Sequence, residues 1–368
     1  MALRILALEP YYGGSHRAFL DGYCAASRHS IELLTMPARK WKWRMRGAAL
    51  AMSESIRAMD GPFDVLLASD YLDLACLVAL LPAPLRDVPR VVYFHENQIT
   101  YPLADEDERD YQYGFTNITA CLAADRVIFN SRYHMESFLD GAGGLLRRMP
   151  DFVPAWAPDA VRRRARVVPV GVDLSQMRAV RADAGERSGR LRVLWNHRWE
   201  YDKCPEEFFE VMAELQDAGC DFDLAVLGQS FDAVPPVFEE ARERFAGRLK
   251  AFGYVESREE YWRVLLESDV VVSTAAHEFF GISVVEAACA GCVPLLPNRL
   301  SYPELLPDTY HSTCLYADRA DMKKRLAHWL RHPDEARAVD LSADMRRFGW
   351  SEVAPVLDAV MDGVQEAD

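Results

Sequence analysis

Short apolar segments recur along this chain, with helix-forming segments between them. Among them are residues 3–9, 90–94, 191–195, 269–273 and 293–296. Consecutive β-branched residues, as in 269–273, are typical of strands buried on both faces of a parallel sheet. Parallel strands need crossover connections, which helices supply. The alternation therefore predicts an α/β fold built from doubly wound parallel sheets.

The length and the distribution of polar residues predict two domains. The chain has 368 residues, enough for two sizeable cores. Residues 175–190 are polar without an apolar period, which predicts a linker. We therefore expect a first domain at 1–174 and a second at 175–344. An amphipathic segment near the end predicts a helix, and we expect about 345–368 to pack back on the first domain.

Overall charge and cysteine usage narrow the class of protein. The formal net charge of −14 argues against a globally basic nucleic-acid-binding protein but leaves local basic surfaces possible. No apolar run is long enough to span a bilayer, and the first residues lack a signal-peptide pattern. Eight cysteines follow no disulfide framework. These features predict reduced thiols and a cytoplasmic protein.

Two glutamates flank the start of a predicted helix after strand 269–273. Glu278 lies in the loop, and the helix opens at about Gly281, after Phe280, and carries Ile282 and Glu286. The first amides of a helix and its dipole favour a phosphate group, and carboxylates accept hydrogen bonds from sugar hydroxyls. The arrangement favours a nucleotide-sugar site, although two glutamates at this spacing also occur as plain loop and surface charges.

The first strand of the second domain leads into a segment with two cations. Arg198 and Lys203 are predicted to lie at the carboxyl edge of that sheet, facing a cleft between the domains. Fixed cations there would stabilise the charge that develops on a departing pyrophosphate without a metal. Surface charges in a turn are the alternative.

The first domain offers two polar loops at the ends of strands. Gly13 and Gly14 follow the first strand and would let the backbone approach a ligand closely. His95, Asn97 and Gln98 follow strand 90–94, where open α/β sheets bind ligands.

The densest basic stretch interleaves charges with aromatic residues at 39–46. Cations neutralise phosphates, and aromatic faces stack on exposed bases. Strict alternation of basic residues with Trp41, Trp43 and Met45 could equally mark an extended segment with one buried face. Nucleic-acid contact and a merely solvated face both remain open for this stretch.

Five strings together make the chain resemble the tRNA-queuosine α-mannosyltransferase family, within the family 4 glycosyltransferases of GT-B fold. They stand at 9–16, 93–98, 108–114, 197–200 and 277–281. The resemblance implies two Rossmann-like domains that face each other across a cleft. It also implies transfer of mannose from GDP-mannose, with retention, to queuosine at the wobble position of tRNA(Asp), without a metal cofactor.

The resemblance and the local sequence features together give each candidate residue a role. His95, Glu278, Arg198 and Lys203 would be catalytic. The donor would be bound by Gly13, Gly14, Arg198, Lys203, Phe280, Gly281, Ile282 and Glu286. The tRNA would be bound by His16, Arg39, Lys40, Lys42, Arg44, Arg46, Asn97, Gln98 and Arg109. A lipid or polysaccharide acceptor is the alternative within this class, and a non-catalytic RNA-binding protein is the alternative outside it.

Overall fold

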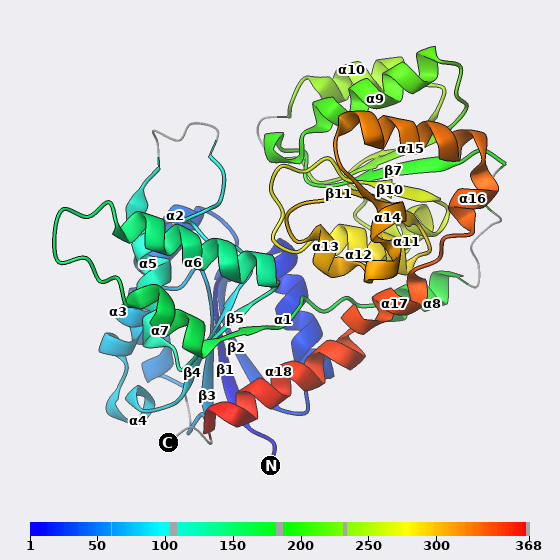
Figure 1. The fold of residues 1–368 in the computed structure, drawn as a ribbon. Coiled ribbons are helices and arrows are strands. Elements are labelled where there is room, and N and C mark those ends of the chain that lie inside the picture. The colour runs from blue at the N-terminus through cyan, green and yellow to red at the C-terminus, as the bar shows by residue number, and fades with distance from the viewer. Residues whose placement is uncertain (60, 104–108, 182–186, 188, 231–233, 366–368) are drawn as a thin grey trace. The chain divides into compact units, whose positions relative to one another are not determined.

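The computed structural model describes residues 1–59, 61–103, 109–181, 187, 189–230 and 234–365. The chain divides into two compact units (Figure 1). Unit 1 comprises Met1–Gly171 and Trp350–Asp368, and unit 2 comprises Val172–Gly349. The sequence predicts boundaries at 174 and about 345. Residues 366–368, at the end of the predicted last helix, lie outside the described chain.

Unit 1 is built on a six-stranded parallel sheet in the order β2-β1-β3-β4-β5-β6. The strands are β1 (Arg4–Tyr12), β2 (Ser30–Pro37), β3 (Val65–Ser69), β4 (Arg90–Phe94), β5 (Arg126–Phe129) and β6 (Ala165–Val167). The helices are α1 (Gly14–Ala26), α2 (Trp41–Arg57), α3 (Leu74–Leu80), α4 (Ala83–Arg86), α5 (Tyr111–Ala123), α6 (Arg132–Leu146), α7 (Ala157–Arg164) and α18 (Trp350–Gln365).

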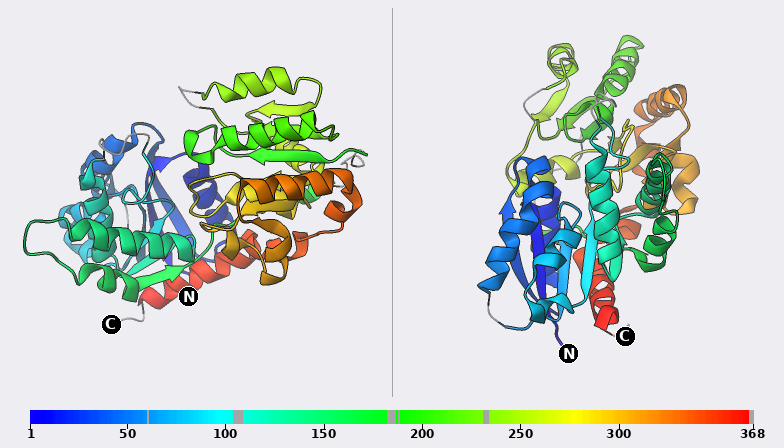
Figure 2. Two further views of the ribbon diagram at one scale, coloured as in Figure 1. Left: turned by 45° about the horizontal axis from the view of Figure 1, so that its top comes forward. Right: turned by 90° about the vertical axis from the view of Figure 1, so that its left-hand side faces the viewer.

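Side chains alternate between the two faces of this sheet and meet different helices on each. Leu6 and Leu8 belong to a core shared with α2, α3, α5, α6 and α7. On the other face, Phe19 of α1 packs on Trp350 of α18, with ring centroids 5.6 Å apart. Tyr23 donates a 2.8 Å hydrogen bond to Asp358 of α18. The last helix therefore completes the core of unit 1 beside α1 (Figure 2).

Unit 2 has a second six-stranded parallel sheet in the order β12-β11-β10-β7-β8-β9. The strands are β7 (Arg192–Asn196), β8 (Asp223–Leu227), β9 (Leu249–Gly253), β10 (Val270–Val272), β11 (Val293–Pro297) and β12 (Leu315–Tyr316). The α-helices are α8 (Ser175–Arg181), α9 (Pro205–Asp217), α10 (Val237–Arg244), α11 (Arg258–Leu266), α12 (Ile282–Cys289), α13 (Tyr302–Leu305), α14 (His311–Cys314), α15 (Arg319–Arg331), α16 (Pro333–Arg337) and α17 (Ser342–Met345). The 3₁₀ turns are η2 (Tyr201–Lys203), η3 (Asp308–Tyr310) and η4 (Arg346–Phe348).

The strand orders mark one preferred ligand position in each sheet. In unit 2 the chain order reverses between β7 and β10, and in unit 1 it reverses between β1 and β3. Open α/β sheets bind ligands beyond the carboxyl ends of the strands at such a reversal. The predicted α/β class with two doubly wound parallel sheets is confirmed.

Two local predictions are wrong. Residues 175–190 are not only a linker, because α8 forms there and buries Met177 and Val180 at helical spacing; residues 182–186 and 188 lie outside the described chain. The basic stretch is not extended, because α2 starts at Trp41. Among the described residues, no helix is both long and apolar enough to cross a membrane.

Candidate functional site

A buried lysine lies at the chain-order reversal of unit 2. Lys203 ends η2, just after β7, and its Nζ donates a 2.6 Å hydrogen bond to the carbonyl of His277. The same Nζ lies 3.1 Å from Asp202 Oδ2 and 3.5 Å from Glu278 Oε2. Only 5% of Lys203 is exposed. The lysine thus ties the end of β7 to the loop after β10, where both predicted site residues meet.

Charge at this point is fixed by the lysine. Burial acts most strongly on Glu278 and raises its pKa, but Lys203 and its other neighbours outweigh burial and lower that pKa to about 2. Burial, and then the lysine charge, lowers the pKa of His197 to about 4. At neutral pH the site therefore presents an ionised Glu278 and a neutral His197 beside Lys203.

Helix α12 begins beside Glu278 at a glycine that a larger residue could not replace easily. Gly281 caps the helix with φ of +97°, and a Cβ there would lie 3.2 Å from Tyr302. Glu278 Oε1 accepts a 3.4 Å hydrogen bond from the amide of Phe280. The amides that follow, including that of Ile282, open the helix and lack intrahelical acceptors. Amides in this position are suited to binding an anion.

Glu286 is held inside unit 2 by two side chains of α11. Its Oε1 accepts from Arg258 at 2.9 Å, and its Oε2 accepts from Tyr261 at 2.6 Å. Asn196, the last residue of β7, donates to the same tyrosine oxygen at 2.8 Å. Each carboxylate oxygen keeps a second lone pair for a ligand hydroxyl. Arg258 and Tyr261 carry no local sequence signal, so sequence reasoning missed them.

Arg198 extends toward solvent in the same loop as Lys203. Its side chain is 43% exposed, and Nη2 lies 3.1 Å from Glu200 Oε2. Its neighbour Trp199 stacks on Phe238, with ring centroids 4.0 Å apart and an interplanar angle of 6°. The tryptophan anchors the loop, while the arginine stays accessible to an anion.

The glycine loop of unit 1 depends on close approach of two backbones. A Cβ on Gly13 would lie 2.4 Å from the Cβ of Ala38, which leads into α2. Gly14 has open space around it but a φ of +52°. Gly13 caps α1, and no side chain makes the cap hydrogen bond. Steric contact therefore requires the first glycine and backbone conformation favours the second.

Gly13→Ala should lower the free energy of unfolding by about 1–3 kcal/mol, the usual cost of overpacking a tight contact. Ala38→Gly in the same chain should restore most of that loss, because it removes the opposing methyl group. Urea unfolding of both single variants and the double variant measures the coupling. Additive losses would contradict the close approach.

His95 is positioned through its backbone. Its amide donates to Asp70 Oδ1, and its carbonyl accepts from Asn130 Nδ2, both at 2.9 Å. Asn117 links Asp70 to the loop that follows β4. Its side chain donates to the Asp70 carbonyl at 2.9 Å and accepts from the Gln98 amide at 2.8 Å. Asp70 and Asn130 are the first residues after β3 and β5. Their position at strand ends was a signal that sequence reasoning did not use.

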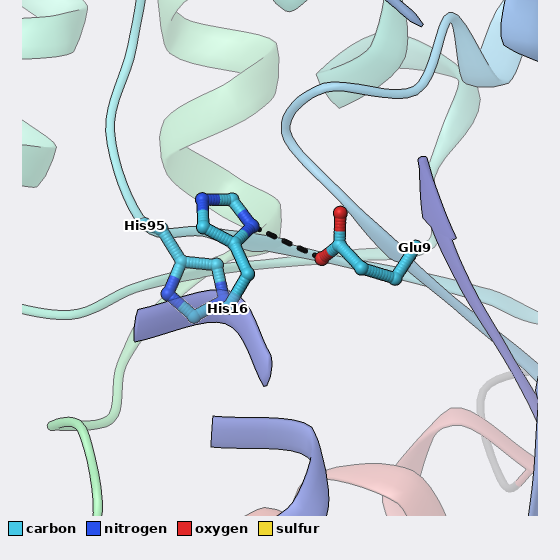
Figure 3. Close-up of side chains that lie close together, drawn as sticks. All are labelled: Glu9, His16 and His95. Carbon is cyan, nitrogen blue, oxygen red and sulfur yellow. Dashed lines mark hydrogen bonds and ion pairs between the residues drawn. The ribbon is translucent and has the colours of Figure 1, made fainter. Parts of the chain in front are cut away.

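The imidazole of His95 lies against a buried acid–base pair (Figure 3). His16 Nδ1 is 3.0 Å from Glu9 Oε2, and the His16 and His95 ring centroids are 4.1 Å apart. One ligand atom from each of the three lies within 4.8 Å of the others, so this group could hold a metal ion. His16 is 5% exposed, and its closest polar partner is a carboxylate. The structure therefore places this predicted tRNA-binding residue in the interior.

Helix α2 exposes most, but not all, of the basic residues predicted to bind tRNA. Arg39, Lys40, Lys42 and Arg46 are exposed. Trp43 is 62% exposed, whereas Arg44 is 7% exposed and donates from Nε to the Pro37 carbonyl at 3.2 Å. A helix turns 100° per residue, so it cannot place alternate residues on one face. The prediction of an exposed Arg44 is therefore wrong, and Trp43 takes its place on the surface.

Three other predicted tRNA-binding residues have structural hydrogen bonds. Asn97 is fully buried, and its Oδ1 accepts from the amides of Ile99 and Thr100. Arg109 donates to the carbonyls of residues 98, 99 and 101. Gln98 Nε2 donates to Glu96 Oε1 at 3.1 Å. These side chains shape the loop after β4, and Glu108, part of the quoted motif, lies outside the described residues.

Comparison with known proteins agrees with both units. Residues 4–172 match the family described as "tRNA-queuosine alpha-mannosyltransferase N-terminal", and residues 176–345 match "Glycosyl transferases group 1". The tRNA-queuosine alpha-mannosyltransferase of Drosophila melanogaster is 38% identical over 89% of this chain and 87% of its own length. The chain belongs to the tRNA-queuosine α-mannosyltransferase family. It is a glycosyltransferase.

More distant relatives of this glycosyltransferase define its fold. Starch synthase IV from Arabidopsis thaliana superposes with a TM-score of 0.74 at 11% identity, covering 100% of both chains. Sucrose-phosphate synthase from Thermosynechococcus elongatus gives 0.73 at 17% identity, covering 99% of this chain and 100% of its own. A GDP-mannose:cellobiosyl-diphosphopolyprenol alpha-mannosyltransferase of Xanthomonas campestris is 25% identical over 74% of this chain and 67% of its own. The enzyme thus has the GT-B fold that its sequence predicts.

Proposed function

We propose that this enzyme transfers mannose from GDP-mannose to queuosine at the wobble position of tRNA(Asp), with retention of the anomeric configuration. The observation that carries the proposal is the buried Lys203, held against Glu278 beside the start of α12. A permanent cation and helix-end amides in one place suit a nucleoside diphosphate. The family supplies the sugar and the acceptor class.

Each part of the donor has a matching group in unit 2. Lys203, the exposed Arg198 and the first amides of α12 would bind the diphosphate. Glu286, fixed by Tyr261 and Arg258, would accept from the ribose hydroxyls. The ionised Glu278 would accept from hydroxyls of the sugar. GDP-mannose as donor is supported by the Xanthomonas campestris relative, whose name specifies it.

The proposed mechanism is transfer on one face of the sugar. The phosphate oxygen that leaves the anomeric carbon takes the proton of the attacking hydroxyl, so both bond changes occur on the same side. Lys203 and the helix amides stabilise the charge on the departing diphosphate, and they require no reorganisation to do so. The proposal requires neither a protein nucleophile nor a metal cofactor. A mannosyl adduct trapped on any carboxylate would contradict it.

The acceptor site would combine His95 with the exposed surface of α2. An aromatic path joins them within unit 1, because Trp41 lies 6.2 Å from Tyr71 and Tyr71 lies 5.1 Å from His16, between ring centroids. Lys42, Trp43 and Arg46 lie at the outer end of that path. Cations and one open indole face suit the phosphates and unstacked bases of an anticodon loop. With tRNA as acceptor, we place the enzyme in the cytoplasm.

Lys42→Ala and Arg46→Ala should each weaken tRNA binding and reduce the salt slope by about one. Trp43→Ala should cost about 1–3 kcal/mol of binding, the value of one stacked base. Filter binding at several salt concentrations measures both effects. Arg57→Ala is the matched control, since Arg57 is an exposed arginine at the far end of the same helix. If Arg57→Ala weakened tRNA binding as much as the other variants, the result would contradict a specific role for Lys42, Trp43 and Arg46.

The proposed activity is tested by offering the purified enzyme queuosine-containing tRNA with GDP-mannose, UDP-glucose or GDP-fucose. After nuclease digestion, mass spectrometry should find queuosine heavier by one hexose with GDP-mannose alone, and an α-specific mannosidase should remove that hexose. An unmodified nucleoside with every donor would contradict the proposal.

A further inference from the structure

A buried ion pair supports His95 from within unit 1. Glu9 comes from β1 and His16 from the first turn of α1, and both are almost fully enclosed. Glu9 Oε1 accepts from the Tyr11 amide at 2.7 Å and from Ser69 Oγ at 3.0 Å, while Oε2 faces His16 Nδ1 at 3.0 Å. The carboxylate is therefore fixed on both oxygens, with one of them aimed at the imidazole.

Further acidic groups surround the His16 ring. Asp70 lies after β3 and Glu96 lies after β4, and both act electrostatically on His16. The Tyr71 ring lies 5.1 Å from the His16 ring, tilted by 40°, and its hydroxyl donates a 2.5 Å hydrogen bond to Glu96. Burial is the largest influence on His16 and disfavours its charge. The charge and hydrogen bond of Glu9 lead the opposing effects, which raise the pKa of His16 to about 9. His16 is thus an imidazolium at neutral pH.

His95 has the opposite environment. Its ring lies 4.1 Å from the His16 ring, tilted by 37°, and is also covered by Tyr93 and Phe19. Burial, then the charge of His16, then that of His134, holds the pKa of His95 well below its usual value. In the described part of the chain, no hydrogen bond to its ring nitrogens is found. The neutral ring keeps one donor and one acceptor for a ligand.

We infer that Glu9 and His16 form a positioning pair: Glu9 orients the His16 ring, and that ring, 4.1 Å from His95, fixes the His95 imidazole for the hydroxyl groups of the substrate. The inference rests on the proposed function for its substrate. In this arrangement the positive charge among Glu9, His16 and His95 is carried by protonated His16 rather than by a metal ion. A metal ion bound by Glu9, His16 and His95 is the competing arrangement, and it would displace the Glu9–His16 hydrogen bond.

Histidine NMR titration of the free enzyme tests the pair without any substrate. In the wild type, His16 should stay protonated above pH 8, and His95 should titrate well below an ordinary histidine. In His16→Gln, the His95 midpoint should rise by at least one pH unit, because the neighbouring charge is gone. In Glu9→Gln, the His16 midpoint should fall by a similar amount. Glu32→Gln, which removes a half-exposed carboxylate on β2, should change neither.

Activity supplies the second readout. His16→Gln should lower kcat/KM by a larger factor at pH 6 than at pH 8.5, where His95 is neutral again. A merely structural residue would lose activity equally at both values. An unchanged His95 midpoint, or one equivalent of tightly bound metal in the purified enzyme, would overturn the inference. Expected titrations without mannose transfer would instead contradict the proposed function alone.

Discussion

Lys203→Ala should reduce mannose transfer by about a thousandfold while tRNA affinity stays within a factor of two. Removing one fixed donor for a developing anion costs about 10²–10³ in rate, and this lysine also keeps Glu278 ionised. The donor groups belong to unit 2, whereas the proposed tRNA surface belongs to unit 1. Single-turnover transfer and filter binding on the same preparation separate the two functions.

Two further variants control for a loss of folding in Lys203→Ala. Lys203→Ala leaves Glu278 and Asp202 without their shared cation, which can cost about 3–5 kcal/mol of stability in a buried site. The triple variant Asp202→Asn/Lys203→Met/Glu278→Gln removes the three charges together and should fold better yet remain inactive. Lys323→Ala, which removes a half-exposed lysine paired with Glu214, should keep full activity. Parallel loss of transfer and tRNA binding in the folded triple variant would contradict the assigned role.

The enzyme should become less stable as pH rises from 6.5 to 9. The folded pKa of His16, about 9, lies above its ordinary value of 6.5. Its contribution to stability is therefore complete below pH 6.5 and is lost as pH rises through 9. Burial is the main cause that raises the pKa of Asp70 to about 8, so its contribution is lost in the same direction. The His16 share is about 3 kcal/mol at 1.36 kcal/mol per pH unit.

Urea unfolding at half-unit pH steps measures this loss. Several buried thiols also have raised pKa values, so they contribute to the same alkaline decline. Comparison with His16→Gln removes that contribution, because the thiols titrate alike in both proteins. The variant should show a flatter decline between pH 6.5 and 9. Parallel curves for the two proteins would show that His16 carries no extra proton in the folded state.

The sheets and the lysine site could be predicted from sequence because their signals are local. Short apolar runs mark the buried strands, and the position of Lys203 just after β7 places it at the carboxyl edge of the sheet. The glycine that opens α12 was also visible, since the conformation at Gly281 favours that residue. In each case the residues within one turn or one strand determine the geometry.

The errors and omissions have a different cause, since they depend on the backbone conformation that a segment adopts and on how neighbouring elements pack. Arg44 points inward because a helix, rather than a strand, follows β2, and the alternating pattern does not distinguish the two. Asn97 shapes its own loop instead of meeting a ligand. Glu9 contacts His16 because of the way α1 packs beside the end of β1. Tyr261 reaches Glu286 only because α11 packs on α12. Spacing along the chain does not encode such contacts.

The choice of acceptor shows whether the enzyme transfers mannose to queuosine in tRNA rather than to another acceptor. The enzyme should be given radiolabelled GDP-mannose with equal amounts of tRNA(Asp) carrying queuosine, the same tRNA carrying guanosine, and a polyprenyl-diphosphate glycolipid. The account predicts label in the queuosine tRNA alone, and its loss with Lys203→Ala. Label in the glycolipid, or equal label in both tRNAs, would contradict it.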